Sequence, residues 1–191
     1  MPPKKDHFPM CFLDTARLRL RPLEPLDADG PYPSWLNDRE VCAGNSHHLR
    51  PYSREEARAY IAKVAGSASD LVLAMVIRDD NQHVGNVALT NLHPLYRRAE
   101  FSILVGSRDH QGRGYGIEAG RALFRHGFLA MNLQRIECGT FSTNVGMQKL
   151  AQALGMKQEG VRRRAAYKDG AYVDVLEYGL LREELQDRDS R

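Results

Sequence analysis

Residues 110–116, with the sequence His-Gln-Gly-Arg-Gly-Tyr-Gly, place three alternate glycines in one short segment. Alternating polarity over residues 99–105 predicts a strand before it, and apolar residues at helical spacing predict a helix after it. Glycine allows backbone conformations closed to other residues and lets a ligand approach closely. The first turn of a helix offers unpaired N–H groups and the positive end of the dipole. This turn is therefore a candidate phosphate or pyrophosphate site, and a plain tight turn is the alternative interpretation.

The spacing within this turn excludes two common nucleotide-binding motifs. No Gly-Lys-Ser/Thr follows, so the turn is not a P-loop. Ile117 stands where the dinucleotide fingerprint needs its third glycine. The remaining pattern is Gln-x-x-Gly-x-Gly, formed by Gln111, Gly114 and Gly116.

A second pattern lies downstream, where Asn144 opens a short helical segment that leads to Leu-Gly-Met at residues 154–156. Together the two patterns resemble the GNAT superfamily of N-acetyltransferases, whose members bind the pyrophosphate of acyl-CoA with the first pattern and carry Asn, a short helix and Leu-Gly-Phe as the second. Residues 35–38 and 159–174 resemble the branch that acetylates ribosomal-protein N-termini and nucleotide-linked amino sugars. The resemblance covers roughly residues 17–181.

The resemblance implies acetyl-CoA as cosubstrate, held by the end of the strand, the glycine turn and the later helix. The implied contacts are Ile103, Leu104, Val105, Gln111, Gly112, Arg113, Gly114, Tyr115, Gly116, Asn144 and Lys149. From the residues alone, Asn144 also suits an N-cap and Lys149 a solvated position on its helix. The histidines show no metal-ligand spacing, so no metal is expected.

Acyl transfer to an amine needs that amine to be neutral, yet only about one alkyl ammonium in a few thousand is neutral at pH 7. A carboxylate can take the proton, directly or through a water. Glu100 is the candidate base, because alternation places it on the strand face opposite Phe101 and Ile103. Resembling enzymes use a Glu at this point of the strand. The alternative is an acid paired with Arg97 or Arg98.

One position departs from the family. Many members carry a Tyr seven residues after the Asn, and it protonates the leaving thiolate; Ala151 stands there in this chain. Tyr167 or Tyr172 is an alternative acid, and a mechanism without an acid is another, since a thiolate leaves fairly well unaided.

The amine acceptor is expected at residues 35–58, outside both cofactor patterns. Trp35, His47 and His48 are the candidate substrate-binding residues, and a polar loop is the alternative for the histidines. The acceptor is a small-molecule amine or a protein N-terminal amine. The arginines at 162–164 form a solvated segment or meet a phosphate on the acceptor.

The elements that must position these residues follow from periodicity. Strands are predicted at 17–23, 71–77, 84–92, 99–105 and around residues 136, 161 and 173, and a capping box at Ser53 and Glu56 opens a helix that ends near Gly66. These elements predict an α/β (α+β) fold with a mixed, mostly antiparallel central sheet of about seven strands flanked by helices. By resemblance, the sheet splays apart next to the glycine turn.

Composition limits the class of protein. The chain has 191 residues, 42% hydrophobic and 27% charged, with a net charge of +3 and no basic stripe with interleaved aromatics. We expect a single acyltransferase domain over residues 1–191, with a loose arm at 1–13 and a charged tail at 183–191. Scattered cysteines and the absence of a signal-like run favour a cytoplasmic protein, and no apolar run is long enough to span a membrane. We expect a monomer or homodimer that binds neither nucleic acid nor membrane.

The leading hypothesis is thus an acetyl-CoA-dependent N-acetyltransferase. A non-catalytic acyl-CoA-binding module is the alternative, favoured by Ala151 and opposed by Glu100. A methyltransferase is a weaker alternative, because its glycine-rich turn follows the first strand of a parallel sheet, whereas about half of this chain precedes the turn.

Overall fold

The computed structural model describes residues 11–185. The predicted loose arm at 1–13 and charged tail at 183–191 therefore lie largely outside the described residues. Where they overlap with them, Leu13 belongs to a short strand and Arg182–Glu184 forms a 3-10 turn.

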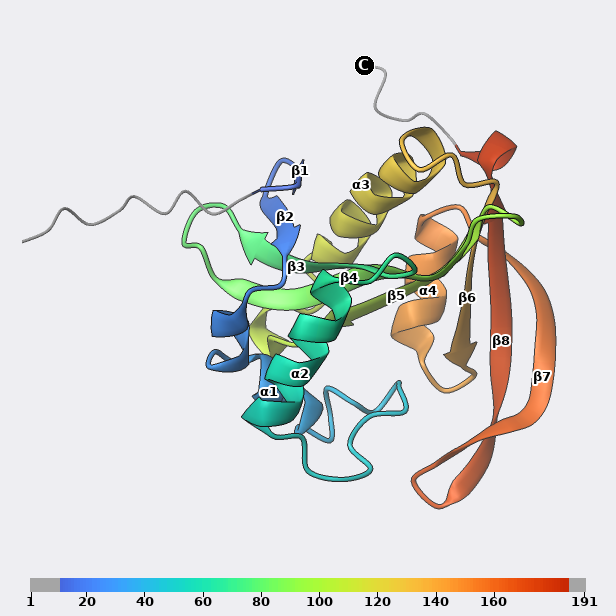
Figure 1. Ribbon diagram of the computed structural model, residues 1–191. Coiled ribbons are helices and arrows are strands. Elements are labelled where there is room, and N and C mark those ends of the chain that lie inside the picture. Colours follow the sequence, from blue (N-terminus) through green and yellow to red (C-terminus); the bar gives the residue numbers. More distant parts are fainter. Residues whose placement is uncertain (1–10, 186–191) are drawn as a thin grey trace, which may run out of the picture.

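One sheet organises the chain (Figure 1). Its strands lie in the order β1-β2-β3-β4-β5-β6-β8-β7, and only β5 and β6 run parallel. The predicted mixed, mostly antiparallel sheet is confirmed, with eight strands in place of about seven because two residues at β1 pair with β2. The strands are β1 Leu13–Asp14, β2 Leu18–Pro22, β3 Leu71–Ile77, β4 His83–His93, β5 Arg98–Val105, β6 Arg135–Phe141, β7 Lys157–Lys168 and β8 Ala171–Leu181.

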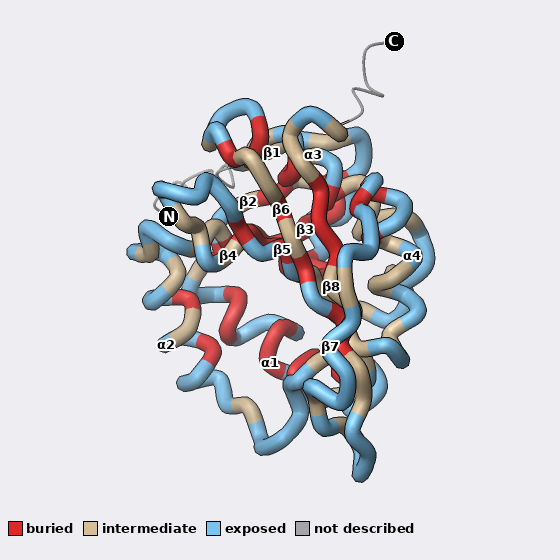
Figure 2. The backbone as a smooth tube through the Cα atoms, turned by 90° about the vertical axis from the view of Figure 1, so that its right-hand side faces the viewer, coloured by how far each residue is buried: buried red, intermediate tan, exposed pale blue. Residues whose placement is uncertain are grey.

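Four α-helices cover the two faces of this sheet: α1 Tyr32–Leu36, α2 Arg54–Ala65, α3 Tyr115–Leu129 and α4 Val145–Ala153. Apolar residues of α3 and α4 join one core cluster and those of α1 and α2 a second, so the sheet separates the two pairs. The capping box of α2 is confirmed: the Glu56 N–H donates to Ser53 Oγ at 3.1 Å, and the Ser53 N–H donates to Glu56 at 2.7 Å. Figure 2 shows burial concentrated on the central strands, with the loop between α1 and α2 mostly exposed.

The sheet opens between β5 and β6. Their parallel register has three pairs and ends at Glu100 opposite Glu137. Beyond this point β6 pairs only with β8, and Figure 1 shows it turning away from β5. We call this opening the splay. The β5 side ends in the glycine turn and α3, and the β6 side ends at the start of α4, so both sequence patterns lie at the splay.

Candidate active site

The glycine turn has the backbone that the sequence predicted. Gly112 and Gly114 have φ of 72° and 82°, in the left-handed region that favours glycine, and Gly114 is the N-cap of α3. The backbone N–H groups of residues 112–117 donate to no acceptor on the described residues. They form a run of free donors at the positive end of a helix, which is the arrangement that binds phosphate groups.

Polar contacts of Thr15 and Arg17 with Glu118 and residue 113, which we call the buttress, hold this turn from behind. Glu118, in the first turn of α3, accepts hydrogen bonds from Thr15 Oγ1 at 2.6 Å and from Arg17 Nε at 2.6 Å. Arg17 also donates to the Arg113 carbonyl at 2.9 Å, and its guanidinium lies 4.6 Å from the centre of the Tyr115 ring. Burial alone would raise the pKa of Glu118, but the hydrogen bonds from Thr15 and Arg17 hold that pKa below its ordinary value.

Gln111 connects the turn to the strand before it. Its side-chain amide donates to the Val105 carbonyl at 2.8 Å, so in this structure Gln111 fixes the end of β5. Gly116 lies close to Ile103 and Leu150, and a Cβ added there would stand 3.5 Å from Ile103. These contacts connect β5, the turn and α4 next to the splay.

Asn144 has a structural role at the other side of the splay. Its side-chain oxygen accepts from the Met147 N–H at 3.0 Å, which confirms the predicted N-cap of α4. Its Nδ2 donates to the Gly44 carbonyl at 2.9 Å. A Cβ on Gly44 would stand 2.3 Å from that nitrogen, so glycine is needed for this close approach.

The loop between α1 and α2 bridges the open end of the splay. At the β5 side, Trp35 of α1, directly before the loop, packs on Gly106, where a Cβ would stand 1.9 Å from the indole ring. At the other side, Lys168 Nζ from the β7–β8 hairpin donates to the carbonyls of Cys42 at 2.9 Å and His47 at 3.5 Å. Together with the Asn144–Gly44 bond, these contacts hold the loop in place across the opening (Figures 1 and 2).

Glu100 lies at the closed end of the splay, at the last residue pair that β5 shares with β6. It is exposed, and the Asn91 side-chain amide donates to its carboxylate at 2.9 Å. The alternative ion pairs predicted from sequence are not formed: Arg98 pairs with Glu137 and Arg97 donates to Gln134. The predicted alternation on β5 is confirmed, since Phe101 is buried on the face opposite Glu100.

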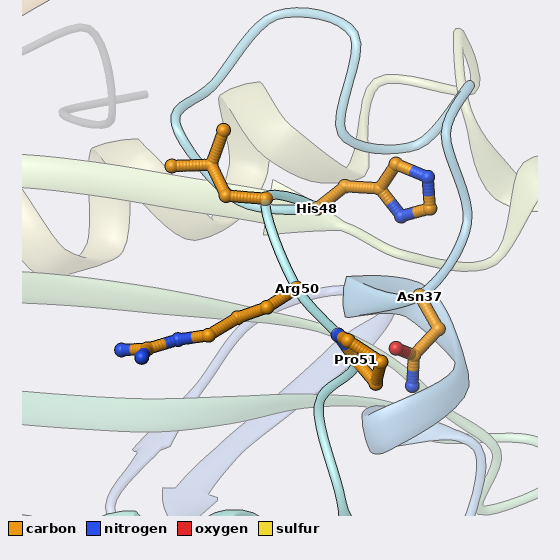
Figure 3. Close-up of a pocket in the computed structure, with 5 residues that line it drawn as sticks. Asn37, His48, Arg50 and Pro51 are labelled. Atoms are coloured by element: carbon orange, nitrogen blue, oxygen red, sulfur yellow. The ribbon is translucent and has the colours of Figure 1, made fainter.

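The predicted acceptor residues separate into two groups. Trp35 is only 5% exposed and belongs to the second core cluster, so it supports the loop from beneath. His47 and His48 lie exposed on the loop, and loss of hydration together with the Lys168 ammonium lowers the pKa of His47. Figure 3 shows His48 beside a shallow pocket of about 280 Å³ lined by Asn37, His48, Leu49, Arg50 and Pro51.

The structure also gives the positions of the other residues that the sequence analysis named. Ala151 is fully buried in the main core, so that position offers no hydroxyl. Tyr167 and Tyr172 are each 61% exposed and form an edge-to-face pair at 5.2 Å on the β7–β8 hairpin. Arg113 and Lys149 are exposed, as a role toward phosphates would require.

Sequence reasoning missed the residues that hold the site together. Arg17, Glu118 and Lys168 act through contacts between residues about a hundred or more positions apart, such as Arg17 with Glu118 and Lys168 with Cys42. Gly106 could have been noticed in the sequence, because a glycine directly after a predicted strand can mark a close approach of another residue. Over residues 11–185, no group of three or more His, Cys, Asp or Glu side chains is arranged to hold a metal, and no helix has the length and apolarity to cross a membrane.

Known proteins are similar to this chain in sequence and in fold. The family model described as acetyltransferase (GNAT) domain matches residues 17–157. An uncharacterised N-acetyltransferase of Bacillus licheniformis, p20, is 29% identical over 180 residues, which cover 90% of this chain and 97% of the relative.

Two solved structures share the fold. A spermidine N-acetyltransferase from Vibrio cholerae in complex with CoA and spermine has a TM-score of 0.80 at 22% identity, over 88% of this chain and 97% of the other. Mycobacterium smegmatis RimJ in complex with CoA-disulfide has a TM-score of 0.78 at 20% identity, over 94% and 91%. The mostly antiparallel sheet rules out the parallel sheet that a methyltransferase would need.

Proposed function

The chain belongs to the GNAT acetyltransferase family and is an N-acetyltransferase, and on this premise we propose that it moves the acetyl group of acetyl-CoA directly onto a primary amine, with Glu100 as general base. We extend this proposal to a single acyltransferase domain that acts in the cytoplasm.

The free N–H groups of residues 112–117 carry the proposal. A run of N–H donors without protein partners at a helix N-terminus favours an anion, which can accept from several of them at once. The pyrophosphate of CoA fits this requirement. The hydrogen bonds of Arg17 to Glu118 and to the Arg113 carbonyl hold the backbone of the turn in place, which lowers the ordering needed on binding.

With the pyrophosphate at the turn, the rest of the cosubstrate extends along the splay between β5 and β6. Residues 103–105 line the β5 side, and Asn144 lies at the β6 side. Beyond Glu100 the edge of β5 has no β6 partner, so its backbone groups are available to the thioester carbonyl and the pantetheine arm.

The chemical step needs one proton acceptor. The amine nitrogen attacks the thioester carbonyl carbon, so a C–N bond forms as the C–S bond breaks. Before the attack, Glu100 takes one proton from the acceptor ammonium, directly or through a water, and the second proton passes from the nitrogen to the leaving thiolate as the C–S bond breaks. Glu100 suits this role because it is exposed at the root of the splay and receives only a neutral amide donor, from Asn91. The thiolate leaves without a tyrosine, since Ala151 replaces it.

The acceptor enters from the face of the sheet that α1 and α2 cover, where the loop between these helices crosses the splay. His47 and His48 form the exposed part of this wall, and Trp35 supports it from the core. The acceptor classes to test are small amines and protein N-terminal peptides.

The test incubates the purified protein with acetyl-CoA and a panel of amines, and follows release of the CoA thiol together with the acetylated product by mass spectrometry. We expect thiol release that requires an amine and equals the product formed. Tight CoA binding without thiol release for any amine would leave the non-catalytic acyl-CoA-binding module as the correct reading.

A further inference from the structure

We propose that the acceptor amine belongs to a small molecule that also carries an anionic group, a carboxylate or a phosphate, which Lys168 and Arg50 bind. This inference rests on the proposed function and narrows its substrate class. We call residues 42–50 of the loop together with the β7–β8 hairpin the acceptor mouth. The bond from Asn144 to Gly44 joins this loop to the β6 side of the splay, and the bond from Lys168 to Cys42 joins the loop to the hairpin. Trp35 on Gly106 joins α1, which precedes the loop, to the β5 side.

Most carboxylates around the acceptor mouth lie in ion pairs with arginines. Of the six Asp and Glu side chains in residues 37–53 and in strands β7 and β8 with their turn, five lie in ion pairs with arginines, and Asp174 accepts from a backbone N–H. The pairs are Asp38 and Glu40 with Arg108, Glu159 with Arg135, Asp169 with Arg39, Asp174 with the Arg164 N–H, and Glu177 with Arg162.

The cations of the same segments are in excess. Four of them have no carboxylate partner among the described residues: Arg50, Arg163, Arg164 and Lys168. Arg50 makes no hydrogen bond or ion pair within residues 11–185, and Figure 3 shows its guanidinium extended away from Asn37 and His48. A polycation would meet net repulsion here, whereas an anion would be attracted.

Lys168 is the central residue of this surface. It is half-buried, and its ammonium donates to two carbonyl oxygens, those of Cys42 and His47. An ammonium has three N–H donors, so one remains without a partner in the described part of the chain. A partly buried cation whose partners are neutral oxygens binds an anionic ligand with a more favourable free energy than a fully solvated cation does.

This charge pattern also restricts where the anion lies relative to the amine. Glu100, at the closed end of the splay, is a carboxylate with no cationic partner among the described residues, and it faces the same side of the sheet as the loop. An acceptor with its amine toward Glu100 and its anion toward Lys168 therefore has each charge next to an opposite one. A simple polyamine satisfies only the first.

The experiment compares matched amines. Initial rates with ethanolamine are set against O-phosphoethanolamine, and propylamine against β-alanine, with spermidine as the polycation. We expect kcat/KM for the phosphorylated or carboxylated member to exceed that of its neutral partner by about ten- to a hundredfold, the range of one charge-assisted hydrogen bond. The larger of the two ratios identifies phosphate or carboxylate as the preferred anion.

Three variants locate the effect. Lys168→Gln keeps a donor for the loop carbonyls but removes the charge, and Arg50→Ala removes an unpartnered cation. Both should reduce the ratio of kcat/KM for an anionic amine to kcat/KM for its neutral partner about tenfold. Arg121→Gln, an exposed arginine on α3 at the other face of the sheet, is the matched control and should keep the full preference.

Faster acetylation of spermidine than of any anionic amine, or an anion preference that survives both Lys168→Gln and Arg50→Ala, would overturn this inference while the proposed acetyl transfer stands. Failure of all the amines, charged and neutral, would instead count against the proposed function itself.

Discussion

Replacing Gly114 with alanine separates the backbone strain of the glycine turn from its ligand chemistry. Gly114 has φ of 82°, and a left-handed conformation costs an L-residue about 1–2 kcal/mol. The new Cβ would stand 3.3 Å from Arg17 Nη2, the end of a flexible side chain that can move by a few tenths of an ångström. Gly114→Ala should therefore fold, with a melting temperature lower by about 2–4 °C for each kcal/mol lost.

The effect on CoA should be larger than the effect on stability. A methyl group on the N-cap of α3 stands among the free N–H donors of residues 112–117 and keeps a phosphate from approaching them. Loss of one charge-assisted hydrogen bond, about 1.5–3 kcal/mol, raises the Kd for CoA by about ten- to a hundredfold. Isothermal titration calorimetry measures the Kd, and thermal melting measures the stability.

Gly170→Ala is the matched control. Gly170 has φ of 89° in the turn between β7 and β8, and a Cβ there would meet nothing within 4 Å. It should lose a similar amount of stability and keep the affinity for CoA. The reasoning is refuted if a folded Gly114→Ala protein binds CoA as the parent does, or if both variants lose the same affinity.

Three further changes test the supports of the site. Glu118→Gln removes the charge of the buttress and should raise the Kd for CoA about three- to tenfold by calorimetry, with little change in kcat. Asn144→Ala should lower the free energy of unfolding by about 1 kcal/mol through the lost N-cap and also release Gly44, whereas Asn144→Asp should keep the cap; equal melting temperatures for the two would contradict this. Burial would raise the pKa of Asp27, but the hydrogen bonds from Arg21 and the Glu24 N–H, with the nearby His83 ring, hold that pKa far below its ordinary value. The stabilisation by ionised Asp27 should therefore be complete above about pH 4 and be lost as the pH falls further. Arg21→Met should lower the free energy of unfolding by about 3 kcal/mol at pH 7, as measured by chemical denaturation.

Local patterns made most of the fold predictable. The apolar run at residues 71–77 became β3 with the same bounds, and Ser53 with Glu56 capped α2 as expected. The glycine turn was predictable because two of its glycines adopt φ values that other residues avoid. Such signals depend on neighbours in the sequence, so they need no knowledge of the tertiary structure.

Contacts between distant segments were not predictable in the same way. The bonds from Asn144 to Gly44 and from Lys168 to Cys42 join residues 100 and 126 positions apart, and no periodicity encodes them. The burial of Trp35 could not be predicted for the same reason. It was expected to contact the acceptor, and its packing on Gly106 depends on a residue 71 positions away. Glu100 was predictable as an exposed acid, but its place at the end of the β5–β6 pairing follows from the register alone.

The most direct test of the central claim is the pH dependence of kcat in Glu100→Gln. Glutamine keeps the size of the side chain and its bond to Asn91, and it removes the base. We expect kcat to fall by about 10²–10⁴ near neutral pH with unchanged affinity for CoA, and the deficit to shrink at high pH, where the amine is already neutral. Parental kcat with an unchanged pH profile would contradict the account and show that another group, or solvent, takes the proton.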